Sequence, residues 1–208
     1  MAIKAILFNA EMVRAILEGR KSCTRKIVKP QQLIGMLPDK CKNGAPEKFL
    51  KEKKLMFKPY CDMTDIELIN TAYKAPYQPG DILYVRETWK KAPNGYYYYE
   101  AWQRNDIADV TKWKPSIRMP KEAARIWLKV TDVRVERLQE ISAESALAEG
   151  ADKYIHTNGG LDENMTITSF IGIWNSTIKK SDIDRYGWDA NPYVWIIEFE
   201  RCEKPEGV

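Results

Sequence analysis

The sequence predicts an α+β protein in which a small, mostly antiparallel β-barrel is flanked by short helices and carries a long insertion. Several segments alternate apolar and polar residues as strands do, few segments have helical spacing, and strands and helices do not alternate as in a parallel sheet. The chain has 208 residues, of which 44% are apolar, and this is enough for one sizeable core. We therefore expect a single domain over residues 1–208.

The N-terminal elements follow from local signals. The apolar run "AILF" at residues 5–8 predicts a strand, and Asn9 is a suitable cap for the helix that follows. Val13 and Ile16 belong to an apolar stripe at helical spacing, and Gly19 favours an end to the helix. The basic stretch "EGRKSCTRK", residues 18–26, would then emerge at this helix end.

A strand over residues 21–28 would separate the side chains of that basic stretch. Alternation places Thr24 and Lys26 on one face of the strand and Cys23 and Arg25 on the other. Cations grouped around hydroxyls and a thiol are typical of a solvated turn, and a pocket for an anion or a nucleobase is the alternative. Both interpretations remain open from the sequence.

Residues 31–76 differ from the rest of the chain. They are rich in proline, glycine and lysine and have little sustained periodicity, which favours an insertion or excursion on the core fold. The lysine run within them is more typical of a solvated loop than of a binding surface.

The second half of the chain supplies the remaining elements. A Pro-Gly turn precedes a strand at residues 82–87, and the tyrosine-rich run "GYYYYEAW" indicates another. The longest strand is expected at residues 124–138. A short helix opened by Ser142 and closed by Gly150, a helix at about residues 168–179 and a last strand at residues 193–201 complete the pattern.

Composition restricts the function. The net charge of +4 comes from 33 basic and 29 acidic residues, so phosphate binding would require local clusters of cations. The four cysteines form no C-x-x-C pair, and the one histidine, His156, lies in a loop-like stretch, so we expect reduced thiols, no metal and no cofactor. No membrane-length apolar run or signal peptide is evident, which favours a cytoplasmic protein without a membrane partner.

Several motifs in order resemble a known family. They are "LEGRKSCTRK", "PGDILYVRETW", "WKPSIRMP", "VTDVRVERLQEISAESALAEG" and "WDANPYVWIIEFE". In this combination the chain resembles ASCH-domain proteins of the form common in bacteriophages and prophages, which are similar in fold to the PUA domains of RNA-modifying enzymes. The resemblance covers residues 3–31 and 77–201. It implies a PUA-like β-barrel and a partner that is RNA or a modified nucleoside.

The family motif near the N-terminus is a glycine, a lysine two residues on, an acidic or hydroxyl residue three further, and then an arginine. Gly19, Lys21 and Thr24 match this motif, whereas Lys26 stands where arginine is usual, with Arg25 beside it. The difference matters because the planar guanidinium of arginine binds an anion through two parallel hydrogen bonds and lysine does not.

The resemblance also implies a candidate activity. A small bacterial ASCH protein removes the acetyl group from N4-acetylcytidine with a lysine, a threonine and a glutamate. These roles fall on Lys21, Thr24 and Glu149 in this sequence. A partly desolvated Lys21 could take a proton from Thr24, whose hydroxyl would attack the acyl carbon, and Glu149 could protonate the leaving amine. A plain ion pair between Lys21 and Glu149 is the alternative.

Further residues are predicted to shape the ligand pocket. They are charged, aromatic or polar side chains near expected strand ends and turns: Arg20, Arg25, Lys26, Arg86, Glu87, Trp89, Ser116, Arg118, Trp188 and Asn191. Some of these residues could have structural roles instead of binding a ligand, since Arg86 and Glu87 could form ion pairs and Asn191 could cap a turn.

Three function classes therefore stay open. The first is a binding module for RNA or a modified nucleoside. The second is a hydrolase, either an amidohydrolase on an N-acylated cytidine or a ribonuclease. The third is a non-catalytic phage accessory or morphogenesis protein that acts through protein contacts. RNA or a nucleoside is the expected ligand in the first two classes.

Overall fold

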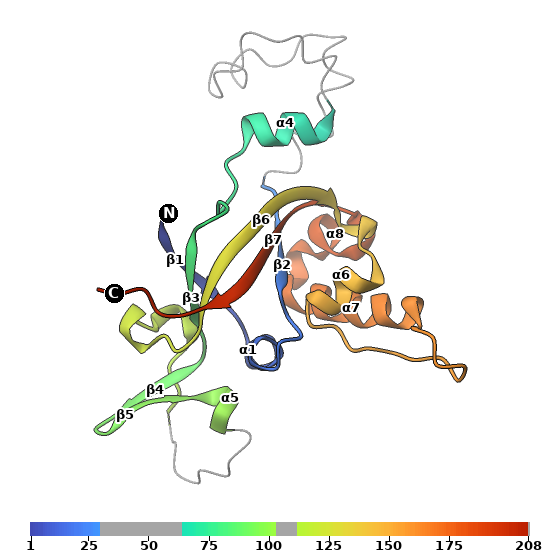
Figure 1. Ribbon diagram of the computed structural model, residues 1–208. Coiled ribbons are helices and arrows are strands. Elements are labelled where there is room, and N and C mark those ends of the chain that lie inside the picture. Colours follow the sequence, from blue (N-terminus) through green and yellow to red (C-terminus); the bar gives the residue numbers. More distant parts are fainter. Residues whose placement is uncertain (30–63, 103–111, 208) are drawn as a thin grey trace.

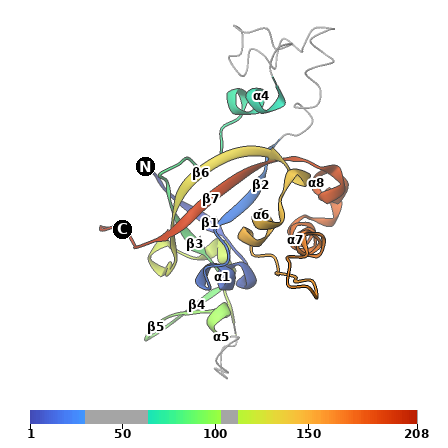
Figure 2. The ribbon, with the colours of Figure 1, turned by 45° about the vertical axis from the view of Figure 1, so that its right-hand side comes forward.

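The structure is a computed structural model that describes residues 1–29, 64–102 and 112–207. It is a mixed α+β fold built on a five-stranded sheet with the order β1-β3-β6-β7-β2. The strands are β1 (Ile3–Leu7), β2 (Cys23–Ile27), β3 (Ile82–Arg86), β6 (Trp127–Arg137) and β7 (Tyr193–Cys202). Only β1 and β3 pair in parallel, and the other neighbours are antiparallel. The long strands β6 and β7 curve strongly across the molecule (Figures 1 and 2).

The two edge strands of this sheet are β1 and β2. Among the described strands no backbone ladder joins them, so the expected closed barrel is not confirmed and the sheet is open. The side chain of Tyr77 spans the opening instead. Its hydroxyl donates a hydrogen bond to the carbonyl of Ala5 in β1 (2.9 Å) and accepts one from Nζ of Lys26 in β2 (3.0 Å).

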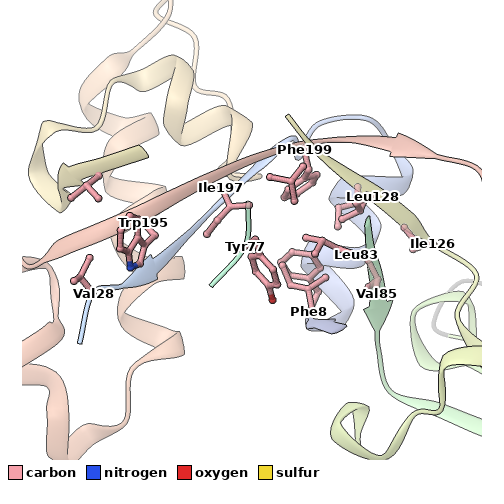
Figure 3. Packing of buried hydrophobic residues seen from close by; sticks show 14 of the residues in the cluster. Phe8, Val28, Tyr77, Leu83, Val85, Ile126, Leu128, Trp195, Ile197 and Phe199 are labelled. Carbon is pink, nitrogen blue, oxygen red and sulfur yellow. The ribbon is translucent and has the colours of Figure 1, made fainter. Parts of the chain in front are cut away.

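Both faces of the sheet are covered. Alternate residues of β7 belong to different clusters: Trp195, Ile197 and Phe199 join the main core, while Val194 and Ile196 pack against the C-terminal helices. Figure 3 shows the main core, in which Phe8 and Leu83 lie close to Phe199. A strand buried on both faces needs apolar residues at consecutive positions, and this explains the run "YVWII".

The helices lie mainly at two places around the sheet. Helix α1 (Ala10–Leu17) follows β1 directly, and the side chain of Asn9 caps it by accepting a hydrogen bond from the backbone N–H of Met12. Helices α6 (Ala143–Ala148), α7 (Glu163–Thr177) and α8 (Ile183–Tyr186) gather beside β2 (Figure 1). Helix α4 (Asp65–Ala72) lies at one end of the molecule, and α5 (Tyr99–Trp102) lies at the other.

The remaining elements are short. Strands β4 (Trp89–Ala92) and β5 (Gly95–Tyr98) form a separate hairpin. The 3₁₀ turns are η3 (Ser116–Arg118), η4 (Lys121–Ala123), η5 (Leu138–Glu140), η6 (Lys180–Asp182) and η7 (Trp188–Ala190).

The structure revises several of the expected boundaries. The helix expected from about residue 168 begins at Glu163, because the Asp162 side chain caps it by accepting from the N–H of Met165. The tyrosine-rich strand ends at Tyr98, where α5 begins. Of the expected excursion, residues 31–63 lie outside the described residues, and the rest includes α4. The single-domain assignment stays a prediction.

Candidate functional site

A buried ion pair links the segment before β2 to the end of α6. Nζ of Lys21 donates hydrogen bonds to Oε2 of Glu149 (2.7 Å) and to the backbone carbonyl of the same residue (2.8 Å). Nη1 of Arg25 donates to Oε1 of Glu149 (3.1 Å). All three side chains are buried: Lys21 is 0% exposed, Arg25 is 1% exposed and Glu149 is 6% exposed. One carboxylate therefore lies between two buried cations.

Local structure holds Glu149 in this place. Helix α6 begins at Ser142, whose side chain accepts from the N–H of Ser145, and Glu149 is its C-terminal cap residue. Gly150 follows at φ +94°, a conformation that favours glycine, and an added Cβ would lie 3.1 Å from Cβ of Ala15. The chain turns tightly here against α1. The N–H of Ser22 also donates to the carbonyl of Ala148 (2.9 Å), which fixes α6 beside β2.

Glu149 forms part of the wall of a cleft of about 460 Å³ between α1 and α7, which we call the Glu149 cleft. This volume is in the range of small-molecule sites in proteins. Its charged lining residues are Glu11, Arg14, Arg20, Glu149 and Asp152, and its polar ones are Asn9, Ser169 and Ser176. Arg20 lies at the rim, where its guanidinium also pairs with Glu18 (2.8 Å). The cleft thus offers both cations and hydrogen-bond acceptors.

Arg25 has hydrogen-bonding capacity that the described residues do not use. Its Nε and Nη2 atoms are buried and have no hydrogen-bond partner among these residues, although Nη2 lies 3.9 Å from Oε2 of Glu136. The guanidinium lies over the ring of Phe170, 5.7 Å from its centroid. Arg25, not Lys26, is therefore the cation of β2 that faces Glu149, as strand alternation requires.

Thr24 lies on the other face of β2. It pairs with Ile197 of the main core, whereas Arg25 pairs with Ile196 of the helix-side cluster. Thr24 is buried, and among the described residues no hydrogen bond connects its hydroxyl to Lys21 or Glu149. Of the three residues in the expected catalytic set, the structure brings two into contact.

The thiol of Cys23 lies beside the same charges. Burial raises its pKa to about 12, and the negative charge of Glu149 adds to this effect. A thiol held in its protonated form is a poor nucleophile at neutral pH. Cys23 therefore contributes a small buried side chain rather than a reactive group.

A second buried charge cluster was not predicted as a group. Nε and Nη2 of Arg125 each donate to the Glu87 carboxylate at 2.8 Å, and Nη2 also donates to Oε2 of Glu100 (3.3 Å). Both carboxylates have only 2% of their surface exposed. Arg14, which lines the Glu149 cleft, lies 3.5 Å from Oε1 of Glu100, so the cluster supports one wall of the cleft.

The other predicted ligand-binding residues near β3 do not line the Glu149 cleft. Arg86 donates to the hydroxyl of Tyr84 and to the carbonyl of Ile117. Trp89 is buried under Nζ of Lys114, and its Nε1 has no partner among the described residues. Ser116 and Arg118 belong to the 3₁₀ turn η3, where Arg118 is exposed.

Trp188 and Asn191 have structural contacts. Trp188 packs edge-on against Phe170, with ring centroids 6.3 Å apart. Asn191 adopts φ +43°, and its side-chain oxygen accepts from the N–H of Gln139 (2.9 Å). The side chain of Asn191 thus bonds the neighbouring turn η5 and not its own turn at residues 189–192, and neither Trp188 nor Asn191 lines the Glu149 cleft. Their ligand role stays a prediction.

Residues 1–29, 64–102 and 112–207 contain no cluster of three or more acidic, histidine or cysteine side chains suited to a metal ion. His156 is exposed and lies 3.4 Å from Asp162. In the same ranges, no helix has both the length and the apolar character that crossing a bilayer requires.

No protein-family model and no curated protein matches this sequence. Among solved structures, the chain is similar to the ASCH domain from Lactobacillus crispatus JV V101. The two share 10% sequence identity, and the alignment covers 96% of this chain and 79% of that one with a TM-score of 0.40. This likeness is too distant to assign a family.

Proposed function

We propose that the protein is a PUA-like ASCH protein that binds a nucleobase, in RNA or in a modified nucleoside, at the Glu149 cleft. The sequence motifs quoted above suggest the family. The proposed ligand class rests on one observation. Glu149, whose carboxylate lies between the buried cations Lys21 and Arg25, forms part of the wall of a cleft large enough for a nucleoside.

The chemistry of Glu149 favours an N–H donor in the ligand. Each carboxylate oxygen accepts one hydrogen bond from Lys21 or Arg25 and keeps capacity for another. Glutamate accepts from the exocyclic amine of cytosine in protein–nucleic acid complexes, so an amino-bearing base such as cytosine fits.

Calorimetric titration with cytidine, and with single-stranded RNA, tests base binding directly. We expect Glu149→Gln to weaken binding at least tenfold, because an amide presents an N–H where the base donates one. Glu144→Gln, an exposed change on the same helix α6, is the matched control and should bind as the parent does. Equal affinity of the Glu149→Gln protein and the parent would show that the base does not bind here.

Hydrolysis of an N4-acylated cytidine is a second candidate function. The 2.7 Å contact between Lys21 and Glu149 favours it, because a proton can pass directly between the two groups. In this reaction the hydroxyl of Thr24 would add to the acyl carbon, the amine would leave with a proton, and water would then release the acid from the threonine ester. The position of Thr24 on the opposite face of β2 makes its hydroxyl the critical group to test.

Chromatography of N4-acetylcytidine incubated with the protein distinguishes these functions. Turnover to cytidine by the parent and by Glu144→Gln, with loss in Lys21→Ala and Thr24→Val, would support the hydrolase. No turnover by the parent would exclude this reaction for that substrate and leave base binding. Shortened products after incubation with RNA would indicate a ribonuclease. If the protein neither bound RNA or cytidine nor converted N4-acetylcytidine, and formed stable oligomers, a role through protein contacts would be favoured.

A further inference from the structure

A second cleft lies near the end of β2 that is farther from Lys21. It has a volume of about 320 Å³, and its lining residues include Lys26, Lys29, Lys74, Tyr73 and Trp195. We call it the lysine cleft. An adjoining hollow of about 280 Å³ shares Tyr73, Lys74 and Trp195 with it. Both are lined in part by residues that follow α4.

The charge of the lysine cleft differs from that of the Glu149 cleft. Three lysines line it, and no aspartate or glutamate is among the described residues that line it or the adjoining hollow. The Glu149 cleft, by contrast, contains three acidic residues and two arginines. Lysines attract anions where the described lining holds no carboxylate, and the low overall charge of the chain makes such a local cluster distinctive.

Two of these lysines form cation–π contacts with tyrosine rings. Nζ of Lys26 lies 4.8 Å from the centroid of the Tyr77 ring, and Nζ of Lys29 lies 5.1 Å from that of Tyr186. Cation–π contacts restrict the positions of the ammonium groups without neutralising their charge. The lysines are therefore partly ordered and remain able to bind an anion.

We propose that the lysine cleft binds the phosphate backbone of single-stranded nucleic acid. The choice of partner rests on the proposed base binding at the Glu149 cleft, since Lys21 precedes β2 and Lys26 and Lys29 lie at or beyond its other end. One strand could thus contact both ends of β2. Basic grooves with aromatic walls are the usual surface for a single strand.

The salt dependence of RNA binding tests this proposal. Fluorescence anisotropy of a labelled, mixed-sequence single-stranded RNA is measured with the full chain at a series of KCl concentrations. Each lost phosphate contact reduces the slope of log K against log salt by about 0.7. We therefore expect the triple variant Lys26→Gln, Lys29→Gln, Lys74→Gln to have a slope shallower by about 2 and weaker binding at low salt.

A matched control removes the same charge elsewhere. The triple variant Lys121→Gln, Lys129→Gln, Lys204→Gln changes three exposed lysines outside both clefts and should keep the slope of the parent. Because Lys26 also bonds Tyr77, the double variant Lys29→Gln, Lys74→Gln serves if the triple variant does not fold, and its slope should be shallower by about 1.4.

Four results would overturn the proposal. The lysine-cleft variants could keep the salt slope of the parent, or the control variant could lose as much of that slope as they do. The parent could fail to bind RNA, or it could bind polyglutamate as tightly as RNA. Cytidine titration decides base binding at the Glu149 cleft separately, so failure of the lysine cleft and failure of the proposed function are distinguishable.

Discussion

Nζ of Lys21 lies 2.7 Å from Oε2 of Glu149, and this contact joins the segment before β2 to the end of α6. Both groups have lost nearly all of their solvent, which is costly for isolated charges. The second hydrogen bond from Lys21 and the one from Arg25 offset this cost. The candidate site is therefore also a structural junction, and its substitutions need a stability measurement beside every activity measurement.

Removal of the Glu149 charge is expected to destabilise the protein. Glu149→Gln leaves Lys21 and Arg25 buried without their carboxylate, and an uncompensated buried charge costs about 3–5 kcal/mol. The free energy of unfolding from urea titration measures this loss. Glu144→Gln is exposed and should stay within about 0.5 kcal/mol of the parent. Equal stability of the two variants would contradict the ion-pair account.

Local sequence signals identified much of the fold but not the contacts between elements. The caps at Asn9 and Ser142 are short-range features, and both were predicted correctly. Alternation along β2 correctly separated Arg25 from Thr24. Periodicity describes the faces of one element, however, and it does not show which elements meet.

The charge cluster around Arg125 shows this limit. Glu87, Glu100 and Arg125 come from three separate segments, and no spacing rule connects them. Glu87 was predicted either to contact a ligand or to form an ion pair, and the structure shows the ion pair, whereas Glu100 and Arg125 were missed. The available signal was weak: a glutamate beside the aromatic residues of "YYYYEAW" is a charge in an otherwise apolar setting.

Arg125→Met should be strongly destabilising. It leaves the Glu87 and Glu100 carboxylates, each 2% exposed, without their shared guanidinium, and we expect a loss of about 3–5 kcal/mol in urea unfolding. Arg118→Met is the control, because Arg118 is exposed. Addition of Glu87→Gln to Arg125→Met should recover part of the loss. No recovery would indicate that packing, rather than charge, is responsible.

The thiol of Cys23 should be almost inert in the folded protein. A pKa raised from 9.0 to about 12 lowers the thiolate fraction at pH 8 about a thousandfold, and burial blocks access as well. Timed alkylation with iodoacetamide, read by peptide mass spectrometry, should label Cys202 well before Cys23. In urea the two rates should converge. Rapid labelling of Cys23 in the folded protein would contradict its burial.

Asp81 should contribute a pH-dependent part of the stability. Burial alone raises the pKa of its carboxyl group, but hydrogen bonds from Lys4 Nζ and from the backbone N–H groups of Ala2 and Gln78 outweigh this and hold the pKa below its usual range. A carboxyl group with a lowered pKa stabilises the fold above its unfolded-state pKa of about 3.9, and this contribution is lost as pH falls through the folded-state pKa.

Thermal unfolding at pH 6, 4.5 and 3 measures this contribution. Asp81→Asn should lower Tm most at pH 6 and should differ least from the parent at pH 3. Asp189→Asn is a suitable control, because Asp189 is exposed. A Tm difference for Asp81→Asn that does not change with pH would show that the carboxylate charge is not involved.

The side chain of Tyr77 bridges the opening between the edge strands β1 and β2. The hydroxyl of Tyr77 bonds both Ala5 in β1 and Lys26 in β2, and no backbone ladder joins these two strands within the described residues. Tyr77→Phe should therefore cost about 1–3 kcal/mol in urea unfolding, since the polar groups on both sides lose a partner. Amide hydrogen exchange should also accelerate in β2 more than in β6, which has paired strands on both sides. Tyr154→Phe, at an exposed position, should change neither quantity. Uniform acceleration in β2 and β6 would show that the hydroxyl stabilises the whole fold and not this edge.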